Sequence, residues 1–414
     1  MLSPKFILNS INPLAIDVCR VLSKAGYQAY LVGGCVRDLL LGIKPKDYDI
    51  TTNALPEKVI KLFPKTYPTG LQHGTITVAM ENEHFEVTTF RVEGEYKDGR
   101  RPEEVFFVSN IKEDLARRDL TLNAMAFNPL SQELIDPFNG FHDLEIGLIK
   151  AVGNPSLRFQ EDGLRIMRVA RFAARFGYVI DQTTFEAMHD NLCTLRKVSK
   201  ERINDELCKT LMSNYDTYGL QILLESKALE IVCPLLIYPN TELYVLPYQN
   251  KCLGDLETRL AYLYGYHFIN DVKRELITLK FSNKEIKRVL FLLDLAEKYN
   301  QFMSEYTVSS YKYFMAHLKN NTPDTWEYTL DQFIKLYTAM GYGIMNYLAK
   351  FQGETVFSRR EMNINGDDLI TIGILPGPEI KRILDQCYQF ILEKPECNEH
   401  FRLLKFVIYG DQLD

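Results

Sequence analysis

The chain has 414 residues, of which 46% are hydrophobic and 25% are charged, and its formal net charge is −6. A chain of this length is too long for one compact core and predicts about two to four domains. The negative charge argues against a uniformly basic nucleic-acid-binding protein, although a local basic surface can still bind phosphates.

The cysteines and the N-terminal segment favour a cytoplasmic protein. The eight cysteines are scattered without a CxxC pair, which predicts free thiols in a reducing compartment and disfavours a structural zinc site. The N-terminal segment has neither a long apolar run nor a cleavage-like site, and no stretch of the chain is apolar for long enough to span a bilayer. We therefore expect no membrane contact.

The pattern of residues 1–145 predicts an α+β head with a small mixed sheet. Apolar residues at helical spacing, punctuated by Gly26, Gly42 and Pro56, predict helices, and period-two alternation predicts strands. Helices are expected within 1–30, 34–42 and 56–63, and strands at 29–32, 47–52, 74–80 and 84–90. An order of helix, strand, helix and then several strands is typical of an α+β domain.

Helical periodicity dominates from about residue 146. The segment "FQEDGLRIMRVARFAARFGYVI" has a strong helical period and ends its helix at Gly177. We expect helices without a second sheet from there to the C-terminus, in a neck (146–207), a body (208–275) and a tail (276–414). Within the tail, Gly377-Pro378 is expected to open a helix, because proline is favoured in the first helical turn.

Two acids separated by one residue, Asp47 and Asp49, begin a predicted strand. Residues two apart on a strand project to the same face, so these carboxylates point together and repel unless a cation lies between them. Mg²⁺ suits such a pair, because it takes one or two carboxylates and completes its shell with water and substrate phosphates.

A glycine pair precedes these acids and predicts an anion site. Gly33 and Gly34 lie between a strand and a helix, where backbone N–H groups can approach an anion closely, and Arg37 can add a bidentate phosphate contact. Together with the acids, this predicts chemistry on a nucleoside triphosphate. The alternative is a plain turn followed by an exposed strand edge.

Glu86 is a candidate third acid for a two-metal site. In "HFEVTTFR", Phe85 and Val87 are expected to face the core, so that Glu86 faces the other acids across the sheet. The alternative is a solvated glutamate on an edge strand.

The motifs together resemble a known family. "GGCVRD" followed by "DYD", "RRDLTLNAMAF" and "EDGLRIMRVARFAARFG" is similar to the class II tRNA nucleotidyltransferases, the CCA-adding enzymes of the polymerase-β superfamily, whose head bacterial poly(A) polymerases share. The resemblance covers residues 14–207 and returns in "NINGDDLITIGILPGPEIKRIL". It implies stepwise addition of C, C and A to the 3′ end of tRNA from CTP and ATP, with release of pyrophosphate.

The resemblance also implies roles for individual residues of the head. Asp47 and Asp49 would hold Mg²⁺ ions, and Glu86 would be the third acid. The motif "RRDLTLNAM" would clamp the nucleotide, with Arg118 and Asn123 holding ribose and phosphate and Asp119 positioning them. A solvated charge cluster is the alternative for this motif.

A second implied group lies on the helix that follows Asp162. Asp162 and Arg165, three residues apart, would read the Watson–Crick edge of the base as a protein template; an i,i+3 salt bridge is the alternative. Arg168, Arg171 and Arg175 continue a stripe from Arg165, opposite an apolar face, and suit the triphosphate and the tRNA backbone. The motif "SKERINDEL", with Glu201 and Arg202, resembles one that braces the template helix.

A polar segment between residues 91 and 115 predicts a flexible loop. The resemblance implies that this loop, with Asp98 and Arg100, allows the switch from C to A addition. Two relatives of the same chemistry remain open: an A-adding enzyme that works beside a separate CC-adding enzyme, and a poly(A) polymerase. A metal-dependent phosphohydrolase or an RNA-binding module is a further alternative, although His142-Asp143 lacks upstream partners at ligand spacing.

Overall fold

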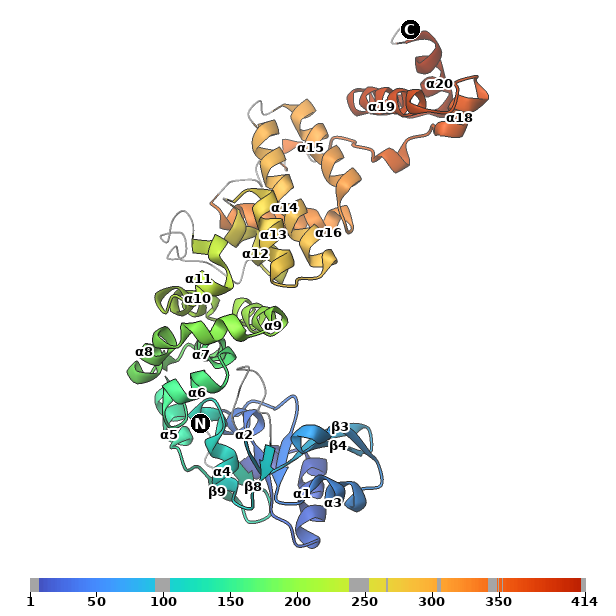
Figure 1. The fold of residues 1–414 in the computed structure, drawn as a ribbon. Helices are drawn as coiled ribbons and strands as arrows, with labels where there is room; N and C mark the ends of the chain where they lie inside the picture. The colour runs from blue at the N-terminus through green and yellow to red at the C-terminus, as the bar shows by residue number, and fades with distance from the viewer. Residues whose placement is uncertain are drawn as a thin grey trace. The chain divides into compact units, whose positions relative to one another are not determined.

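In the computed structural model the chain forms two compact units, Met1–Leu246 and Pro247–Asp414 (Figure 1). The structure describes residues 7–93, 105–237, 253–265, 267–303, 307–341, 348, 350–351 and 353–410. None of the helices within these ranges is both long and apolar enough to cross a membrane.

The first unit is built on a mixed sheet of seven strands in the order β3-β4-β5-β2-β1-β8-β9. The strands are β1 (Ala29–Val32), β2 (Asp49–Thr52), β3 (Thr66–Gly70), β4 (Thr75–Met80), β5 (Glu83–Thr89), β8 (Ala126–Asn128) and β9 (Glu133–Ile135). Within the described part of this sheet, β2 and β5 are the one parallel pair. The predicted strands and the β4–β5 hairpin are confirmed.

Helices cover the sheet, and every side chain of the interior strand β1 is therefore buried. The helices of this head are α1 (Pro13–Lys24), α2 (Gly34–Leu40), α3 (Pro56–Leu62), α4 (Ile111–Ala116) and α5 (Gly140–Ile146). On one face, Ile111 and Leu115 of α4 pack against Tyr30 and Val32. Since alternate strand residues point to opposite faces, Leu31 packs on the other side of the sheet.

Six further α-helices lie in the described part of the first unit, and we call them the helical layer. They are α6 (Pro155–Glu161), α7 (Leu164–Phe176), α8 (Gln182–Asp190), α9 (Lys200–Leu211), α10 (Asp216–Glu225) and α11 (Leu229–Val232). Helix α7 packs against α9 and α10. A Cβ on Gly219 would lie 2.6 Å from that of Ala174, so a glycine allows α10 to approach α7 closely.

Two small ribbons lie outside the main sheet. Strand β6 (Arg91–Glu93) pairs with β7 (Val105–Phe107), and β10 (Leu148–Ile149) pairs in parallel with β11 (Val179–Ile180). The expectation of no second sheet after residue 145 is therefore wrong. Gly177, with a φ of 70°, ends α7 in the left-handed region and turns the chain back, which lets the β11 residues extend beside β10.

The described part of the second unit consists of helices and their connections. They are α12 (Leu256–Tyr264), α13 (Ile269–Thr278), α14 (Asn283–Met303), α15 (Val308–Asn321), α16 (Trp326–Ala339), α18 (Gly366–Thr371), α19 (Pro378–Glu393) and α20 (His400–Tyr409). Its core includes Tyr299, Phe314, Phe333 and Tyr337, whose neighbouring ring centroids lie 4.8–5.6 Å apart. The helix predicted to open at Gly377-Pro378 is confirmed as α19.

Short 3₁₀ helices connect several of these elements. They are η1 (Ile7–Ser10), η2 (Leu71–His73), η3 (Thr121–Asn123), η4 (Leu192–Lys197), η5 (Pro234–Ile237), η8 (Arg359–Glu361) and η9 (Pro395–Cys397). The α+β head followed by helices confirms the predicted fold class. The predicted boundaries between neck, body and tail stay a prediction.

Candidate active site

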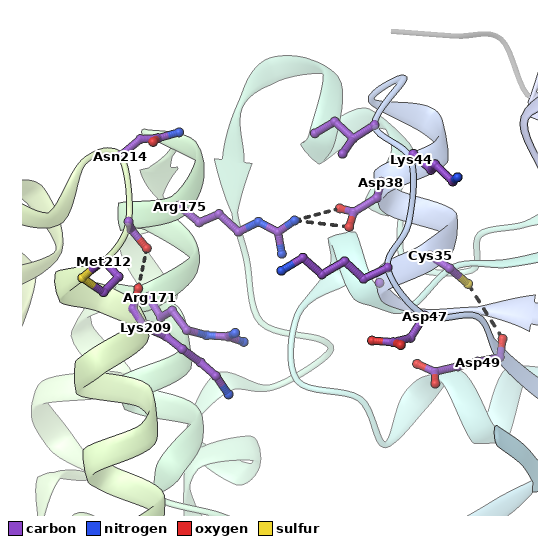
Figure 2. Close-up of a pocket in the computed structure, with 14 residues that line it drawn as sticks. Cys35, Asp38, Lys44, Asp47, Asp49, Arg171, Arg175, Lys209, Met212 and Asn214 are labelled. Carbon is purple, nitrogen blue, oxygen red and sulfur yellow. Dashed lines mark hydrogen bonds and ion pairs between the residues drawn. The ribbon is translucent and has the colours of Figure 1, made fainter. Parts of the chain in front are cut away.

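A cleft of about 590 Å³ lies in the first unit, with the head on one side and the helical layer on the other (Figure 2). Its walls carry both acids and cations. They are formed by Gly34, Cys35, Asp38, Ile43, Lys44, Lys46, Asp47, Asp49, Arg171, Arg175, Lys209, Met212, Ser213 and Asn214.

Asp47 and Asp49 share this cleft because the residue between them is anchored in the core. Tyr48 is 6% exposed, and its hydroxyl donates to the Ser10 carbonyl oxygen (3.3 Å) and accepts from the Asn12 N–H (3.2 Å). Since neighbouring residues of an extended chain point to opposite sides, the two flanking acids point outward together. Figure 2 shows their carboxylates side by side, as the alternation predicts.

Glu86 lies beside Asp49, its partner in the parallel β2–β5 register. Phe85 and Val87 are buried and Glu86 is exposed, so the predicted orientation of the strand is confirmed. Among the described residues, however, no three His, Cys, Asp or Glu side chains come close enough together to hold a metal ion. Glu86 is nevertheless close enough for its charge to act on Asp49, and its role as a third acid stays a prediction.

The electrostatics of Asp49 suit a bound cation. Burial raises the pKa of Asp49; the charge of Arg118 lowers this pKa, and those of Glu86 and Asp47 raise it again, so that it ends above its usual value. The ionised carboxylate therefore has unfavourable surroundings that a divalent cation would relieve. Asp47 and Asp49 are hard oxygen donors, and two carboxylates beside a substrate phosphate meet the ligand preference of Mg²⁺.

Gly33 makes room for an arginine of the head. Its φ is 75°, and a Cβ at this position would lie 2.8 Å from Nη1 of Arg118. The Nε of Arg118 is buried without a hydrogen-bond partner. Burial lowers the pKa of Arg118, while the charge of Asp114 opposes this shift. Gly33 and Arg118 thus lie together, while Gly34 lines the cleft itself.

Arg37 occupies a different position from the one expected for a phosphate ligand. Its side chain is buried, and its Nε and Nη2 donate to Oδ1 of Asp38 (2.9 and 2.7 Å) while Nη1 donates to Oδ1 of Asn123 (2.5 Å). Since these donors already serve Asp38 and Asn123, the geometry favours a brace between α2 and η3 over a phosphate contact. The sequence motif did not reveal these partners because they depend on tertiary contacts.

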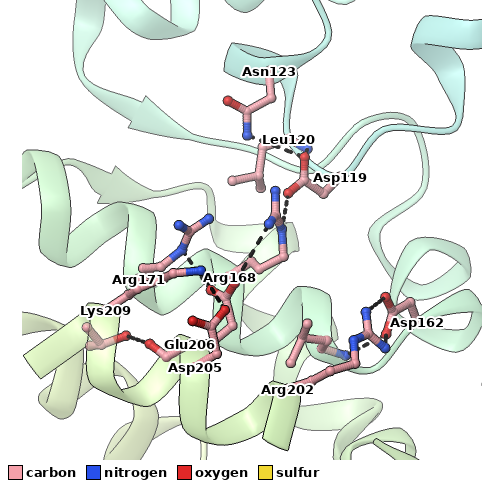
Figure 3. A network of polar contacts seen from close by, with 12 residues as sticks. Asp119, Leu120, Asn123, Asp162, Arg168, Arg171, Arg202, Asp205, Glu206 and Lys209 are labelled. Atoms are coloured by element: carbon pink, nitrogen blue, oxygen red, sulfur yellow. Dashed lines mark hydrogen bonds and ion pairs between the residues drawn. The ribbon is translucent and has the colours of Figure 1, made fainter. Parts of the chain in front are cut away.

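The arginine stripe of α7 joins the head to the helical layer (Figure 3). Arg168 donates from Nε to Oδ2 of Asp119 (2.6 Å), and its Nη1 lies 3.7 Å from Glu206. Arg171 pairs with Glu206 at 2.7 Å. Burial raises the pKa of Asp119. The charge and hydrogen bond of Arg168, together with the charge of Arg165, lower this pKa by more, so that it ends well below its usual range.

A second ion pair crosses the same junction. Arg175, near the end of α7, lies 3.2 Å from Oδ2 of Asp38. Ile166, Val169 and Ala170 on the opposite face of α7 are buried, which confirms the predicted apolar face. The stripe therefore forms internal ion pairs, a role that the sequence did not predict.

Asp162 and Arg165 differ from the predicted pair on one helix. Asp162 lies between α6 and α7 in an extended conformation, with a φ of −145°, because Gly163 separates it from the start of α7. It accepts hydrogen bonds from Arg202 (2.7 Å) and from the Leu164 N–H (3.0 Å). Arg165 donates to Glu161 (2.6 Å). Arg202 thus contacts the expected template residue directly.

Sequence reasoning missed several residues that line or brace the cleft. Asp38 is within the "GGCVRD" motif and Glu206 within "SKERINDEL", but neither was singled out. Lys44, Lys46 and Lys209 were also missed. The sequence offered a signal for two of these lysines, because Lys44 and Lys46 lie just ahead of the acidic pair.

Comparisons with known proteins agree over nearly the whole chain. Residues 29–150 match a family model described as the poly A polymerase head domain, residues 177–238 one described as the probable RNA and SrmB-binding site of polymerase A, and residues 258–407 one described as putative tRNA nucleotidyltransferase domain 2. A CCA-adding enzyme of Lactobacillus helveticus is 35% identical over 390 residues, which cover 91% of this chain and 92% of that protein. The chain belongs to the CCA-adding enzyme family.

Further members of the CCA-adding enzyme family agree. The CCA-adding enzyme of Limosilactobacillus reuteri (strain DSM 20016) is 36% identical over 382 residues, covering 92% of each chain. The crystal structure of the Bacillus stearothermophilus CCA-adding enzyme in complex with CTP superposes with a TM-score of 0.79 at 29% identity, covering 96% of this chain and 98% of that one. Nucleotidyltransferases of this kind use divalent metal ions, which is consistent with the donors at Asp47 and Asp49.

One expected part of a CCA-adding enzyme site lies outside the described residues. Asp98 and Arg100, expected in the loop that allows the switch from C to A, fall in the segment 94–104. The strands that flank this segment, β6 and β7, pair with each other, with Arg91 opposite Phe107. The role of the loop stays a prediction.

Proposed function

We propose that the protein adds CCA to the 3′ end of tRNA without a nucleic-acid template, using CTP and ATP and releasing pyrophosphate. The observation that carries this function is the Asp47–Asp49 pair in a cation-lined cleft, in a chain that aligns almost end to end with CCA-adding enzymes. Because tRNA and nucleoside triphosphates meet in the cytoplasm, we place the protein there.

In the mechanism that we propose, Asp47 and Asp49 would hold Mg²⁺, with Glu86 beside them as the third acid. The ions would lower the pKa of the tRNA 3′-hydroxyl and neutralise the charge of the triphosphate. The protein itself contributes alignment and fixed charge. Arg118 and Asn123 would hold the nucleotide, with Gly33 leaving the space that Arg118 needs.

Selection of the base is assigned to Asp162 and Arg165. A carboxylate and a guanidinium supply the acceptors and donors that a base would otherwise supply to its partner. Arg202 and Glu161 support this assignment, because they hold the two side chains in defined orientations. Asp98 and Arg100 would act in the loop that changes the preference from CTP to ATP.

The two alternatives within the superfamily are distinguished by the RNA that each would extend. The experiment is incorporation on tRNA transcripts that end at the discriminator base, at C, and at CC. CCA addition predicts that all three are extended to the same CCA end and that Asp47→Ala extends none. Extension of the CC transcript alone would indicate an A-adding enzyme, and a lengthening adenylate tract on unrelated RNA would indicate a poly(A) polymerase.

A further inference from the structure

Asp114, on α4, is a fully buried acid of the head that the mechanism leaves without a role. One of its oxygens is firmly held. Oδ1 accepts hydrogen bonds from Nε (3.0 Å) and Nη2 (2.9 Å) of Arg117 and from the Arg91 N–H (3.3 Å). Because a buried carboxylate is costly unless it is paired and hydrogen-bonded, these three donors fix the position of the Asp114 side chain.

The second oxygen of Asp114 has looser contacts. The Thr51 hydroxyl lies 3.4 Å from Oδ2, and Nη2 of Arg118 lies 3.6 Å from it. The distance to Arg118 is too long for a good hydrogen bond, so charge is the main attraction between the two groups. Asp114 therefore draws Arg118 toward itself without occupying the donors of that guanidinium.

Arg118 in turn has donor capacity to spare. Its Nε is buried without a hydrogen-bond partner in the described part of the chain. Buried polar groups of this kind are rare in native structures, and a ligand that arrives during function is one explanation for them. Gly33 leaves room for the guanidinium, since a Cβ there would lie 2.8 Å from Nη1. Arg118 is thus oriented by charge and open to an acceptor.

The contact with Thr51 ties Asp114 to the strand that carries the metal-binding acids. Thr51 lies two residues after Asp49 on β2, so the two side chains project to the same face. The Thr51 hydroxyl also lies 3.2 Å from the Thr88 carbonyl oxygen on β5, the parallel neighbour of β2. Asp114 therefore holds Arg118 at a defined place relative to Asp49, and the charge of Arg118 acts on Asp49.

We propose that Asp114 is a positioning residue for nucleotide binding, which holds Arg118 ready for the incoming CTP or ATP and in register with Asp49. Asp114 acts through Arg118 and does not touch the substrate. The proposal rests on the proposed function, which supplies the nucleotide that Arg118 holds. A purely structural Asp114, which only compensates the charge of Arg117, is the alternative that an experiment must separate from it.

The test is a double-mutant cycle of Asp114→Asn and Arg118→Ala, with the Kd for CTP and for ATP measured by isothermal titration calorimetry. Asp114→Asn alone should raise both Kd values about tenfold, the loss expected of a charge-assisted contact. In the Arg118→Ala background the same substitution should raise them by at most about twofold, because the group through which it acts is gone. An equal rise in both backgrounds, or none in either, would overturn the proposal. Loss of stability alone cannot produce this coupling.

The matched control is Glu257→Gln, which makes the same acid-to-amide change at a buried acid of the second unit, paired with Arg288 at 2.9 Å. It should lower Tm and leave both Kd values unchanged.

Thr51→Val, which is nearly isosteric, decides the matter if Asp114→Asn does not fold. It should raise both Kd values about two- to threefold, and only while Arg118 is present. Unchanged Kd values in this variant would then count against the proposal. A wild-type protein that shows the coupling but adds no CCA would contradict the proposed function and leave the role of Asp114 standing.

Discussion

Gly33 lacks a side chain at a position where two constraints meet. Its φ of 75° favours glycine, and a Cβ would lie 2.8 Å from Nη1 of Arg118. Gly26 has a similar φ of 87°, but a Cβ there would meet nothing within 4 Å. Gly26 therefore has the backbone constraint without the steric one. The two glycines share a backbone conformation, but of the two only Gly33 lies close to Arg118, the arginine that we propose holds the nucleotide.

We therefore predict that Gly33→Ala and Gly26→Ala both lower the free energy of unfolding, by about 1 kcal/mol or more, because alanine disfavours positive φ. Only Gly33→Ala should also raise the KM for CTP and ATP, since it displaces Arg118. Thermal unfolding and steady-state kinetics of both variants provide the measurement. Equal effects on KM would show that the Arg118 contact is unimportant.

The raised pKa of Asp49 leads to a prediction about stability as well as activity. Its pKa is raised in the folded protein, so its contribution to stability is favourable below the unfolded value of about 3.9 and is lost as the pH rises through the higher folded value. At neutral pH the ionised carboxylate thus costs stability. Asp49→Asn should raise Tm in the presence of a chelator, abolish the rise in Tm on adding Mg²⁺, and lower incorporation by about a thousandfold.

The control for this variant is Asp190→Asn, because the Asp190 side chain is 73% exposed and lies outside the cleft. It should leave both the Mg²⁺-dependent rise in Tm and incorporation unchanged. If Asp49→Asn kept the wild-type response to Mg²⁺, the metal assignment would be wrong.

Base selection depends on Arg165 in the proposed mechanism. Arg165→Ala removes the donors that would face the base, so discrimination among CTP, ATP, GTP and UTP should fall by about tenfold or more, within the 1–3 kcal/mol that a bidentate base contact supplies. Ratios of kcat/KM for the four nucleotides measure this effect. Arg196→Ala, which removes an exposed arginine of η4, should leave these ratios unchanged.

For single residues, the sequence predicts the direction in which a side chain points better than it predicts the residues that the side chain contacts. The alternation around Tyr48 correctly predicts that Asp47 and Asp49 point the same way, because it depends only on local backbone geometry. The partners of Arg37 could not be predicted, since Asn123 is 86 residues distant in the sequence. Long-range contacts of this kind leave no local periodicity.

Among the elements, α7 carries four arginines and no acid, and its stability depends on partners outside the helix. Glu206 of α9 lies beside both Arg168 and Arg171, and its side chain is 4% exposed. Removing one member of a buried ion network leaves the remaining charges without compensation.

We predict that Glu206→Gln lowers the free energy of unfolding by about 3 kcal/mol, because two partly buried guanidinium groups lose the buried carboxylate that they share. Glu201→Gln makes the same chemical change at an exposed position of the same helix, and should change stability by less than about 0.5 kcal/mol. Urea unfolding of both variants measures the difference. Similar losses in the two would indicate that the network does not depend on Glu206.

The ends of helices were predicted well where a glycine or a proline marks them. Gly42 and Pro56 mark the boundaries of α2 and α3 closely, and Gly377-Pro378 marks the start of α19. The prediction that Asp162 lies on a helix was wrong, because the period of α7 continues backward in the sequence across Gly163. A Cβ on Gly163 would lie 2.5 Å from the Thr194 backbone, a tertiary contact that no periodicity reveals.

The whole molecule consists of two units, each with its own apolar core. Phe333 in the second unit is fully buried among Tyr299, Phe314 and Tyr337. Phe85 is similarly buried in the first unit. Units with separate cores can unfold in separate transitions.

We predict two thermal transitions. Phe333→Ala should lower the midpoint temperature of one and Phe85→Ala that of the other. The cavity that each substitution leaves should lower the free energy of unfolding of its unit by about 3–5 kcal/mol. Differential scanning calorimetry of the two variants provides the measurement. A single transition shifted equally by both substitutions would mean that the units unfold as one. The sequence predicted several domains from its length, but its composition changes too gradually after residue 146 to locate the boundary between these two.

The pairing of Asp49 with Glu86 has a consequence for the history of the gene. One codon inserted or deleted within β5 ahead of Glu86 would exchange the faces of the strand, placing this acid in the core and Val87 in the solvent. Descendants of this gene can therefore vary β5 by replacement of residues but not in length.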